Sequence, residues 1–288
     1  MNNKKSLLIG TVLLSLFSSL SIKAFSVINH NDISHNFSGL YFTGQYRPAV
    51  SHFSSFTVSE SNFATQELVM LQPDNRWSID LKESITQGTK FSGAYTAKFQ
   101  DNAASFSGAI GYSYPENLKF EFEVSYEKFD VKTTQGYQVT NTAVFALARK
   151  TISIPQDSGN TQNNQYVVMK NSGLSIASIM INSCYDMSFY NLVVSPYICA
   201  GIGEDFIKFF DTLYIKLAYQ GKLGVNYSLS SRFNIFADVY YHKVIGNQFK
   251  NLNVIHAVAL TDFPKATSAI ATLNVAYFGG EAGIRFIL

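Results

Sequence analysis

Charged side chains alternate with apolar ones along several segments of this 288-residue chain, and these are the residues whose types and spacing could do chemistry. From Leu118 to Glu127, one face of an extended chain would be apolar and aromatic, and the other would carry acids and bases. The charged residues placed in this way are Lys119, Glu121, Glu123, Glu127, Lys216, Lys222, Arg232, Asp238, His242, Glu281 and Arg285. Around a water-filled lumen they would set ion selectivity, whereas in a narrow interior they would pair as a salt-bridged plug.

Catalytic and metal-binding patterns are weak in this sequence. Asp238 and His242 share one face, but four residues along a strand separate them by about 13 Å, too far for a hydrogen bond. No serine lies in a G-x-S-x-G elbow, and the G-x-G within residues 200–205 lacks the rest of a dinucleotide fingerprint. Three histidines near the N-terminus lack the spacing of known metal sites: His30, His35 and His52. We therefore expect no enzyme, cofactor or metal.

The composition restricts the class of protein that could position these charged faces. Only 15% of the residues are charged, and aromatic residues also reach 15%, with 24 Phe and 17 Tyr against one Trp. A mean hydropathy of +0.04 is too low for a helical membrane protein. A β-rich globular chain and an outer-membrane barrel are the two classes that remain.

The first 26 residues read as a secretory signal peptide. Lys4 and Lys5 precede an uncharged stretch, and residues 24–26 offer small side chains for cleavage after Ser26. An N-terminal membrane anchor is the alternative. Cleavage would remove three of the 22 basic residues and no acid, which leaves a net charge of −1 on residues 27–288. That balance gives no electrostatic reason to expect nucleic-acid binding.

Strand length and connection length favour the barrel over a soluble sandwich, which alternation alone would also fit. Residues 213–229 alternate over 17 positions, whereas average globular strands have about five or six residues. Short connections at 115–117 and 230–232 contrast with long polar ones at 47–104, 130–172 and 246–269. Short turns at one end and long loops at the other are typical of outer-membrane barrels.

We predict one domain over residues 27–288, an all-β transmembrane antiparallel barrel with short periplasmic turns and four long outer loops. Its eight strands are expected near 37–46, 105–114, 118–129, 173–185, 194–205, 213–229, 232–245 and 270–288. A phase slip at Gly279 and Gly280 suggests a bulge. Ten or twelve strands are the alternative, because residues 91–99 could extend the wall.

Cys184 and Cys199 lie 15 residues apart in a chain expected to be exported, where a disulfide persists. A hairpin turning between Asn191 and Leu192 would place them opposite each other. Free thiols and bonds to neighbouring chains are alternatives.

The chain ends in an amphipathic segment that resembles the signal by which barrels are recognised for membrane insertion. Gly283, Phe286 and Leu288 carry this match, although the usual signal ends on an aromatic residue. We expect the barrel assembly machinery and outer-membrane lipid as partners.

Several stretches together resemble the major surface antigen and outer membrane protein family of Ehrlichia and Anaplasma, of the surface antigen family 2 type. They are Phe37–Pro48, Phe106–Tyr114, Phe120–Glu127, Ser195–Gly203 and Tyr240–Asn247. The resemblance implies a surface-exposed outer-membrane β-barrel, porin activity in some members, and variable outer loops that host antibodies recognise.

We therefore expect a surface antigen that acts as a passive porin for small hydrophilic solutes. The alternative is a closed barrel that serves as an adhesin or structural surface protein through its outer loops. Loop aromatics that could contact a host molecule are Phe53, Phe56, Phe63 and Trp77. A homo-oligomer is a further alternative.

Overall fold

The computed structural model describes residues 38–61, 64–72, 90–133, 143–149, 166–187, 194–254, 256–257 and 268–288. Several sequence-based expectations lie outside these residues: the signal peptide, His30, His35, Phe63, Trp77 and the turn between Asn191 and Leu192. Within the described residues no helix is long and apolar enough to cross a membrane.

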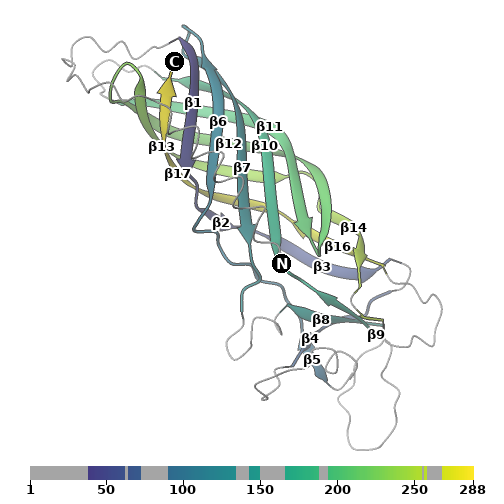
Figure 1. Ribbon diagram of the computed structural model, residues 1–288. Helices are drawn as coiled ribbons and strands as arrows, with labels where there is room; N and C mark the ends of the chain where they lie inside the picture. Colours follow the sequence, from purple (N-terminus) through teal and green to yellow (C-terminus); the bar gives the residue numbers. More distant parts are fainter. Residues whose placement is uncertain are drawn as a thin grey trace, which may run out of the picture. The chain divides into compact units, whose positions relative to one another are not determined.

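Eight antiparallel strands form a closed barrel, as predicted (Figure 1). In sheet order they are β1 (Gly39–Tyr46), β6 (Phe106–Ser113), β7 (Leu118–Phe129), β10 (Leu174–Asp186), β11 (Ser195–Phe209), β12 (Thr212–Ser228), β13 (Phe233–Val244) and β17 (Ala276–Ile287). The barrel closes where β1 pairs with β17. We call the end with the connections 114–117 and 229–232 the short-turn end, and the opposite end the loop end.

The register of the strands fixes the width of the barrel. A path that starts at Tyr41 on β1 and crosses from each strand to the paired residue on the next reaches Tyr277 on β17. Tyr277 in turn pairs with Ser51 on β2, which continues β1. One circuit therefore advances the chain from residue 41 to residue 51. This ten-residue stagger over eight strands corresponds to a strand tilt of about 40° and to an interior that side chains can fill.

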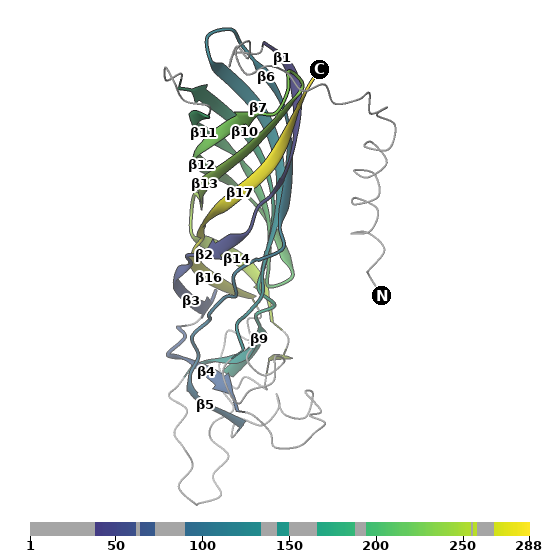
Figure 2. The ribbon, with the colours of Figure 1, turned by 90° about the vertical axis from the view of Figure 1, so that its left-hand side faces the viewer.

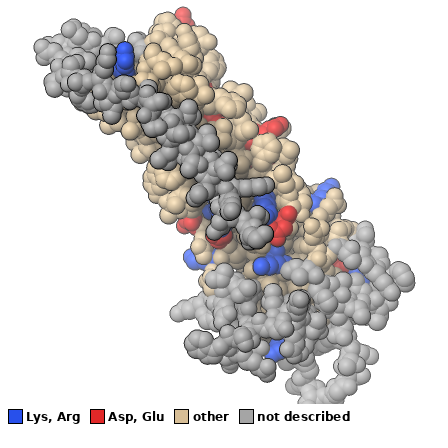
Figure 3. All heavy atoms as spheres, viewed as in Figure 1, with Lys and Arg blue, Asp and Glu red and all other residues tan. Residues whose placement is uncertain are grey.

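Alternation of side chains separates an apolar outer wall from a polar interior. Leucine, isoleucine, valine, phenylalanine and tyrosine occupy exposed positions on all eight strands, which is typical of a membrane barrel. The alternation holds at Ile179, Met180 and Ile181, because Met180 points inward and both isoleucines are exposed. Figure 3 shows few charged side chains on the barrel wall and more of them toward the loop end.

Two further sheets form at the loop end, and we call them together the extension (Figure 2). The three-stranded sheet contains β14 (Gln248–Asn253), β16 (Ser268–Asn274) and β3 (Ser54–Glu60). The five-stranded sheet contains β15 (His256–Ala257), β9 (Tyr166–Lys170), β8 (Val144–Ala148), β4 (Glu67–Leu71) and β5 (Phe91–Ala94). Residues 91–94 thus add a strand to the extension, and the barrel keeps eight. Short β2 (Ala49–Ser51) pairs with β17.

The third outer connection differs from the prediction, because it is a tight turn of Phe210 and Asp211 instead of a long loop. Both residues have positive φ values, 48° and 57°, as in a type I′ hairpin turn. Phe-Asp is not the Asn-Gly signal of such turns, and burial of Phe210 in the core holds it there. Strand β11 therefore runs to Phe209 instead of ending at residue 205.

The last predicted strand is also divided. Residues 268–274 belong to the extension as β16, and the barrel strand begins at Ala276. The pairing of β17 with β13 is continuous through Gly279 and Gly280, so the expected bulge is not there. The break lies at Val275, whose carbonyl accepts a hydrogen bond from the Val244 amide.

An apolar core joins the extension to the loop end of the barrel. Phe129, Ile207 and Tyr277 from the barrel belong to the same buried cluster as residues of β8, β9, β14 and β16. Phe53 and Phe56, expected as exposed loop aromatics, are half-buried against this core. Phe53 contacts Phe129 with ring centroids 5.0 Å apart. Their burial is caused by pairing partners far along the chain, which the loop sequence does not reveal.

Candidate functional site: a charge network inside the barrel

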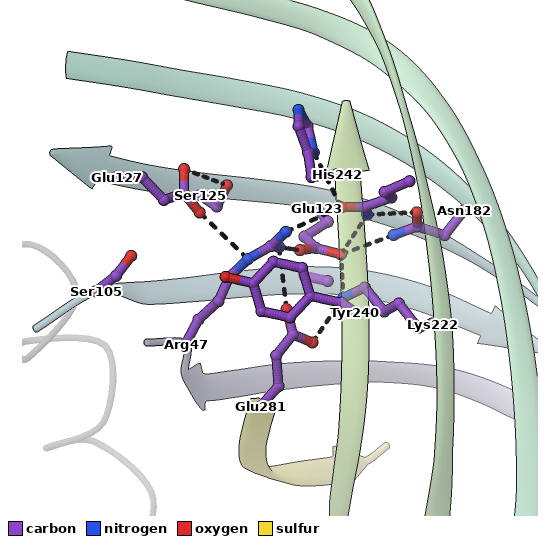
Figure 4. Close-up of polar contacts among 12 residues, drawn as sticks. Arg47, Ser105, Glu123, Ser125, Glu127, Asn182, Lys222, Tyr240, His242 and Glu281 are labelled. Carbon is purple, nitrogen blue, oxygen red and sulfur yellow. Dashed lines mark hydrogen bonds and ion pairs between the residues drawn. The ribbon is translucent and has the colours of Figure 1, made fainter. Parts of the chain in front are cut away.

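Arg47 lies at the centre of the barrel interior and is fully buried (Figure 4). It follows the last residue of β1, where the backbone continues into Pro48 and β2. Its guanidinium forms an ion pair with Glu123, and its Nη1 and Nε atoms lie 3.1 Å from Glu281 and 3.2 Å from Glu127. Three carboxylates from β7 and β17 thus surround one cation that cannot reach water.

Glu123 connects Arg47 to a second buried cation. Lys222 on β12 donates to Glu123 at 2.7 Å and to Glu281 at 2.8 Å. The Asn182 and Gln220 side-chain amides also donate to Glu123, at 2.7 and 3.2 Å. Because each buried charge has opposite charges and amide dipoles beside it, the cost of removing it from water is offset.

A second layer of contacts lies toward the short-turn end. Arg285 donates to Glu121 at 3.1 Å and to the Asn226 side chain at 2.8 Å. The Tyr41 hydroxyl donates to Glu121 at 2.8 Å. Lys119 pairs with Asp186 at 2.7 Å. A further contact in this layer joins the Tyr197 hydroxyl to Asp238.

Toward the loop end the polar network meets the apolar core. His242 Nε2 lies 2.8 Å from Asp205, and the His242 ring stacks on Tyr277 at 4.6 Å between centroids. The Tyr277 hydroxyl approaches Glu127 at 3.4 Å. Tyr277 is also a member of the apolar core, so it joins the two regions.

Nine of the eleven charged residues expected inside the barrel are buried there, and two are not. The nine are Lys119, Glu121, Glu123, Glu127, Lys222, Asp238, His242, Glu281 and Arg285. Arg232 is exposed, because β13 begins one residue later and leaves it in a turn. Lys216 contacts the extension instead, donating to the Gln248 carbonyl at 3.0 Å with its ammonium over the Phe249 ring. The extended β11–β12 hairpin carries Lys216 beyond the polar interior.

Sequence reasoning missed three charged residues of the network: Arg47, Asp205, and Asp186, which lies one residue past the predicted strand 173–185. Arg47 was assigned to the long connection 47–104, yet the inward-facing positions at Tyr41 and Gln45 continue with a period of two to residue 47. Continuing the period of two would have found it. Asp205 was placed at a strand end, and its contact with His242 joins β11 to β13 across the interior. No local pattern indicates that contact.

The interior between these layers contains buried side chains and a small void. A void between Gln45, Asp238 and Arg285 has a volume of about 10 Å³, which is about the space of one water molecule. Ion pairs occupy the centre of the interior, and the apolar core lies at its loop end.

Cys184 and Cys199 form a disulfide between paired positions of β10 and β11. Both are buried inside the barrel beside Tyr197 and Phe236. The bridge therefore joins two neighbouring strands near the short-turn end.

The C-terminal residues lie where the barrel closes. Gly283 faces inward next to Phe236 and Gln45. Phe286 packs against Phe233 with ring centroids 5.0 Å apart, and Leu288 is exposed. Their recognition by an assembly machinery stays a prediction.

Comparisons with known proteins place the chain among surface antigens. Residues 33–288 match the family model described as surface antigen. Over 251 residues the chain is 31% identical to major surface antigen 4 of Anaplasma marginale, covering 86% of this chain and 84% of that protein. The structure of outer membrane protein OprG from Pseudomonas aeruginosa is 13% identical over 88% of this chain and 98% of its own, with a TM-score of 0.49. Neisserial surface protein A is 12% identical over 87% and 98%, with a TM-score of 0.39.

Proposed function

The chain belongs to the surface antigen family, and on that premise we propose that it is a closed outer-membrane barrel that does not conduct and whose function is carried by the extension. The barrel would anchor the extension at the cell surface as a structural surface protein or adhesin. This function is non-enzymatic and needs no cofactor. Contacts with host molecules or antibodies would be made at the loop end.

The observation that carries this proposal is the pairing of Arg47 with Glu123, Glu127 and Glu281 at the centre of the interior. A conducting lumen needs solvated charges along a continuous wet path, and these four side chains are fully buried or nearly so. Opening a path would require these ion pairs to separate before water could replace their partners. That cost opposes spontaneous opening.

The apolar core supports the same conclusion at the loop end. Phe129 on β7 and Tyr277 on β17, three strands apart around the barrel, lie with ring centroids 5.4 Å apart. Hydrated ions would have to pass these rings after leaving the ion-pair network. The ion-pair network and the apolar core would obstruct ions one after the other, so a passive porin is the weaker hypothesis.

Planar-bilayer recording of the purified, folded protein tests the proposal. Insertion is verified separately by protease protection in vesicles of the same lipid. We expect inserted protein without stable openings. The informative variant is the Glu121→Ala/Glu123→Ala pair inside the barrel, and the matched control is Glu204→Ala, which removes an exposed carboxylate from the outer wall.

Steady openings of the unmodified protein would overturn the proposal if their ion preference changes in the Glu121→Ala/Glu123→Ala variant and not in Glu204→Ala. That result would identify the interior as the conducting path. Openings that respond to neither change would also contradict a non-conducting protein. Inserted protein that stays silent supports the closed barrel.

A further inference from the structure

On two strands, the apolar outer wall ends toward the loop end of the barrel with the same sequence of residue types. On β7, the exposed Tyr126 is followed two residues later by the exposed Lys128. On β13, the exposed Tyr241 is followed two residues later by the exposed Lys243. An aromatic residue and then a charge is the pattern expected where a barrel leaves the membrane.

Strand β12 breaks this pattern. Beyond Tyr219, its next three outward positions are Leu217, Ile215 and Leu213, which are 53%, 62% and 63% exposed. Leu213 lies six residues past Tyr219, which at the tilt of the strands is a rise of about 15 Å. Ile245, just after β13, donates its amide to the Leu217 carbonyl at 2.7 Å and is 48% exposed. We call Leu213, Ile215, Leu217 and Ile245 the apolar strip.

An apolar strip above the membrane requires an explanation. Single exposed apolar residues are ordinary in soluble proteins, but contiguous ones mark surfaces that another molecule covers. The strip lies on the outward side of the wall, away from the apolar core that seals the loop end. Within the described chain, nothing buries it.

Three outward charges lie beside the strip: Lys208, which pairs in register with Leu213 and forms an ion pair with Asp211, and two opposite charges, Glu204 and Lys243. Glu204 on β11 pairs in register with Leu217, and Lys243 on β13 pairs with Tyr219. Because the stagger is ten residues over eight strands, a residue lies about 1.25 residues closer to the loop end than its partner on the preceding strand of the sheet order. Lys243 and Glu204 therefore lie at nearly the same height along the barrel axis. Both are exposed, and in the described part of the chain neither takes part in an ion pair.

We propose that the apolar strip is the contact surface between two copies of this chain in the membrane. A twofold axis parallel to the membrane normal, passing between Leu217 and Ile245, would pack the strip against itself. Facing copies place the β11 side of one opposite the β13 side of the other. Glu204 of each copy then meets Lys243 of the second copy, so that both flanks are matched by opposite charges.

A second copy fits these features better than lipid does. Lipid would cover the apolar side chains, but it would not account for the equal height of Glu204 and Lys243 on either side of the strip. The pattern is self-complementary, which is what a twofold contact requires. The proposal is independent of whether the interior conducts, because the strip lies on the outer wall.

Cysteine cross-linking in lipid vesicles tests the contact directly. Leu217→Cys lies near the proposed axis, so two copies should form a disulfide-linked dimer on mild oxidation. The native cysteines do not interfere, because they are already bonded to each other and buried. The matched control is Lys128→Cys, at the same end of the barrel and 53% exposed, but on β7. We expect the Leu217→Cys dimer and no Lys128→Cys dimer.

Charge reversal in the Leu217→Cys protein distinguishes a matched contact from random collisions. Glu204→Lys or Lys243→Glu alone places like charges together, and each should lower the dimer fraction by about fivefold or more. Both reversals in one chain restore opposite charges across the axis and should recover most of it. Far-UV circular dichroism checks that each variant is folded.

Absence of the Leu217→Cys dimer in folded, inserted protein would overturn the proposal. A dimer fraction that neither single reversal lowers would also overturn it. So would a double reversal that recovers nothing in a folded protein. In those cases lipid or a different protein covers the strip.

Discussion

Replacement of Arg47 by alanine should destabilise the barrel more than any surface charge deletion. Arg47 has no exposed surface and contacts three carboxylates. At an effective dielectric constant of about 20, the contacts at 3.1 and 3.2 Å each have a gross attraction of about 5 kcal/mol. Desolvation offsets much of this, but removing one partner leaves the others buried and uncompensated. We expect a loss of about 3 to 5 kcal/mol in the free energy of unfolding.

The measurement is equilibrium urea unfolding of the protein in lipid vesicles, followed by far-UV circular dichroism and extrapolated to zero urea. The matched control is Lys128→Ala, which breaks the pair with Asp130. Their side chains are 53% and 52% exposed, so the loss should stay below about 1 kcal/mol.

A double variant tests whether the loss comes from uncompensated carboxylates. Glu281→Gln in the Arg47→Ala background removes one buried negative charge and should recover part of the stability, a non-additive result. If Arg47→Ala lies within about 1 kcal/mol of the unmodified protein, the pairing does not hold the interior together. A fully additive double variant would also refute the reasoning.

Two other predictions concern the disulfide and a buried tyrosine of the extension. Replacing both Cys184 and Cys199 by alanine should lower the free energy of unfolding by up to about 3 kcal/mol, because the disulfide closes a loop of 15 residues. Urea unfolding of the unmodified protein with a reductant present should show the same loss. Equal stability with and without the disulfide would contradict this prediction. Burial against Phe145 raises the pKa of Tyr95 to about 12. Below pH 10 the phenol is neutral in both states. As the pH rises from 10 to 12 the unfolded form ionises first, so stability falls by up to about 2.7 kcal/mol. The pKa of Tyr166 is also raised by burial, to about 12, so Tyr95 is not the only contributor to the total decrease. Urea unfolding of Tyr95→Phe should therefore show a smaller decrease, and a decrease equal to that of the unmodified protein would exclude a contribution from Tyr95.

The wall of the barrel could be predicted from the sequence because its signal is local. Strand β7 was predicted with its observed bounds, Leu118–Phe129, because apolar and polar side chains alternate along it. The same period placed Glu123 and Lys222 in the interior. The extension was not predicted, because its strands have four to seven residues in most cases and pair with distant segments.

The missed residues have a different cause. Arg47 precedes a proline, and local rules end an element there, whereas β1 and β2 both pair with β17 and so continue across Pro48. Phe210 and Asp211 form a turn without turn-type residues, because the apolar core holds Phe210 in place. In both places tertiary packing overrides the local preference.

The sequence by itself determined which side chains face lipid and which face inward, because side-chain direction along a strand depends only on neighbours in the chain. Only the tertiary structure decided what the inward residues do. The ten-residue stagger brings Arg47, Glu123, Lys222 and Glu281 from four strand segments to one point, and that register is a property of the closed sheet. Charges that could have lined a wet passage are paired instead, because at this diameter they meet at the centre of the barrel.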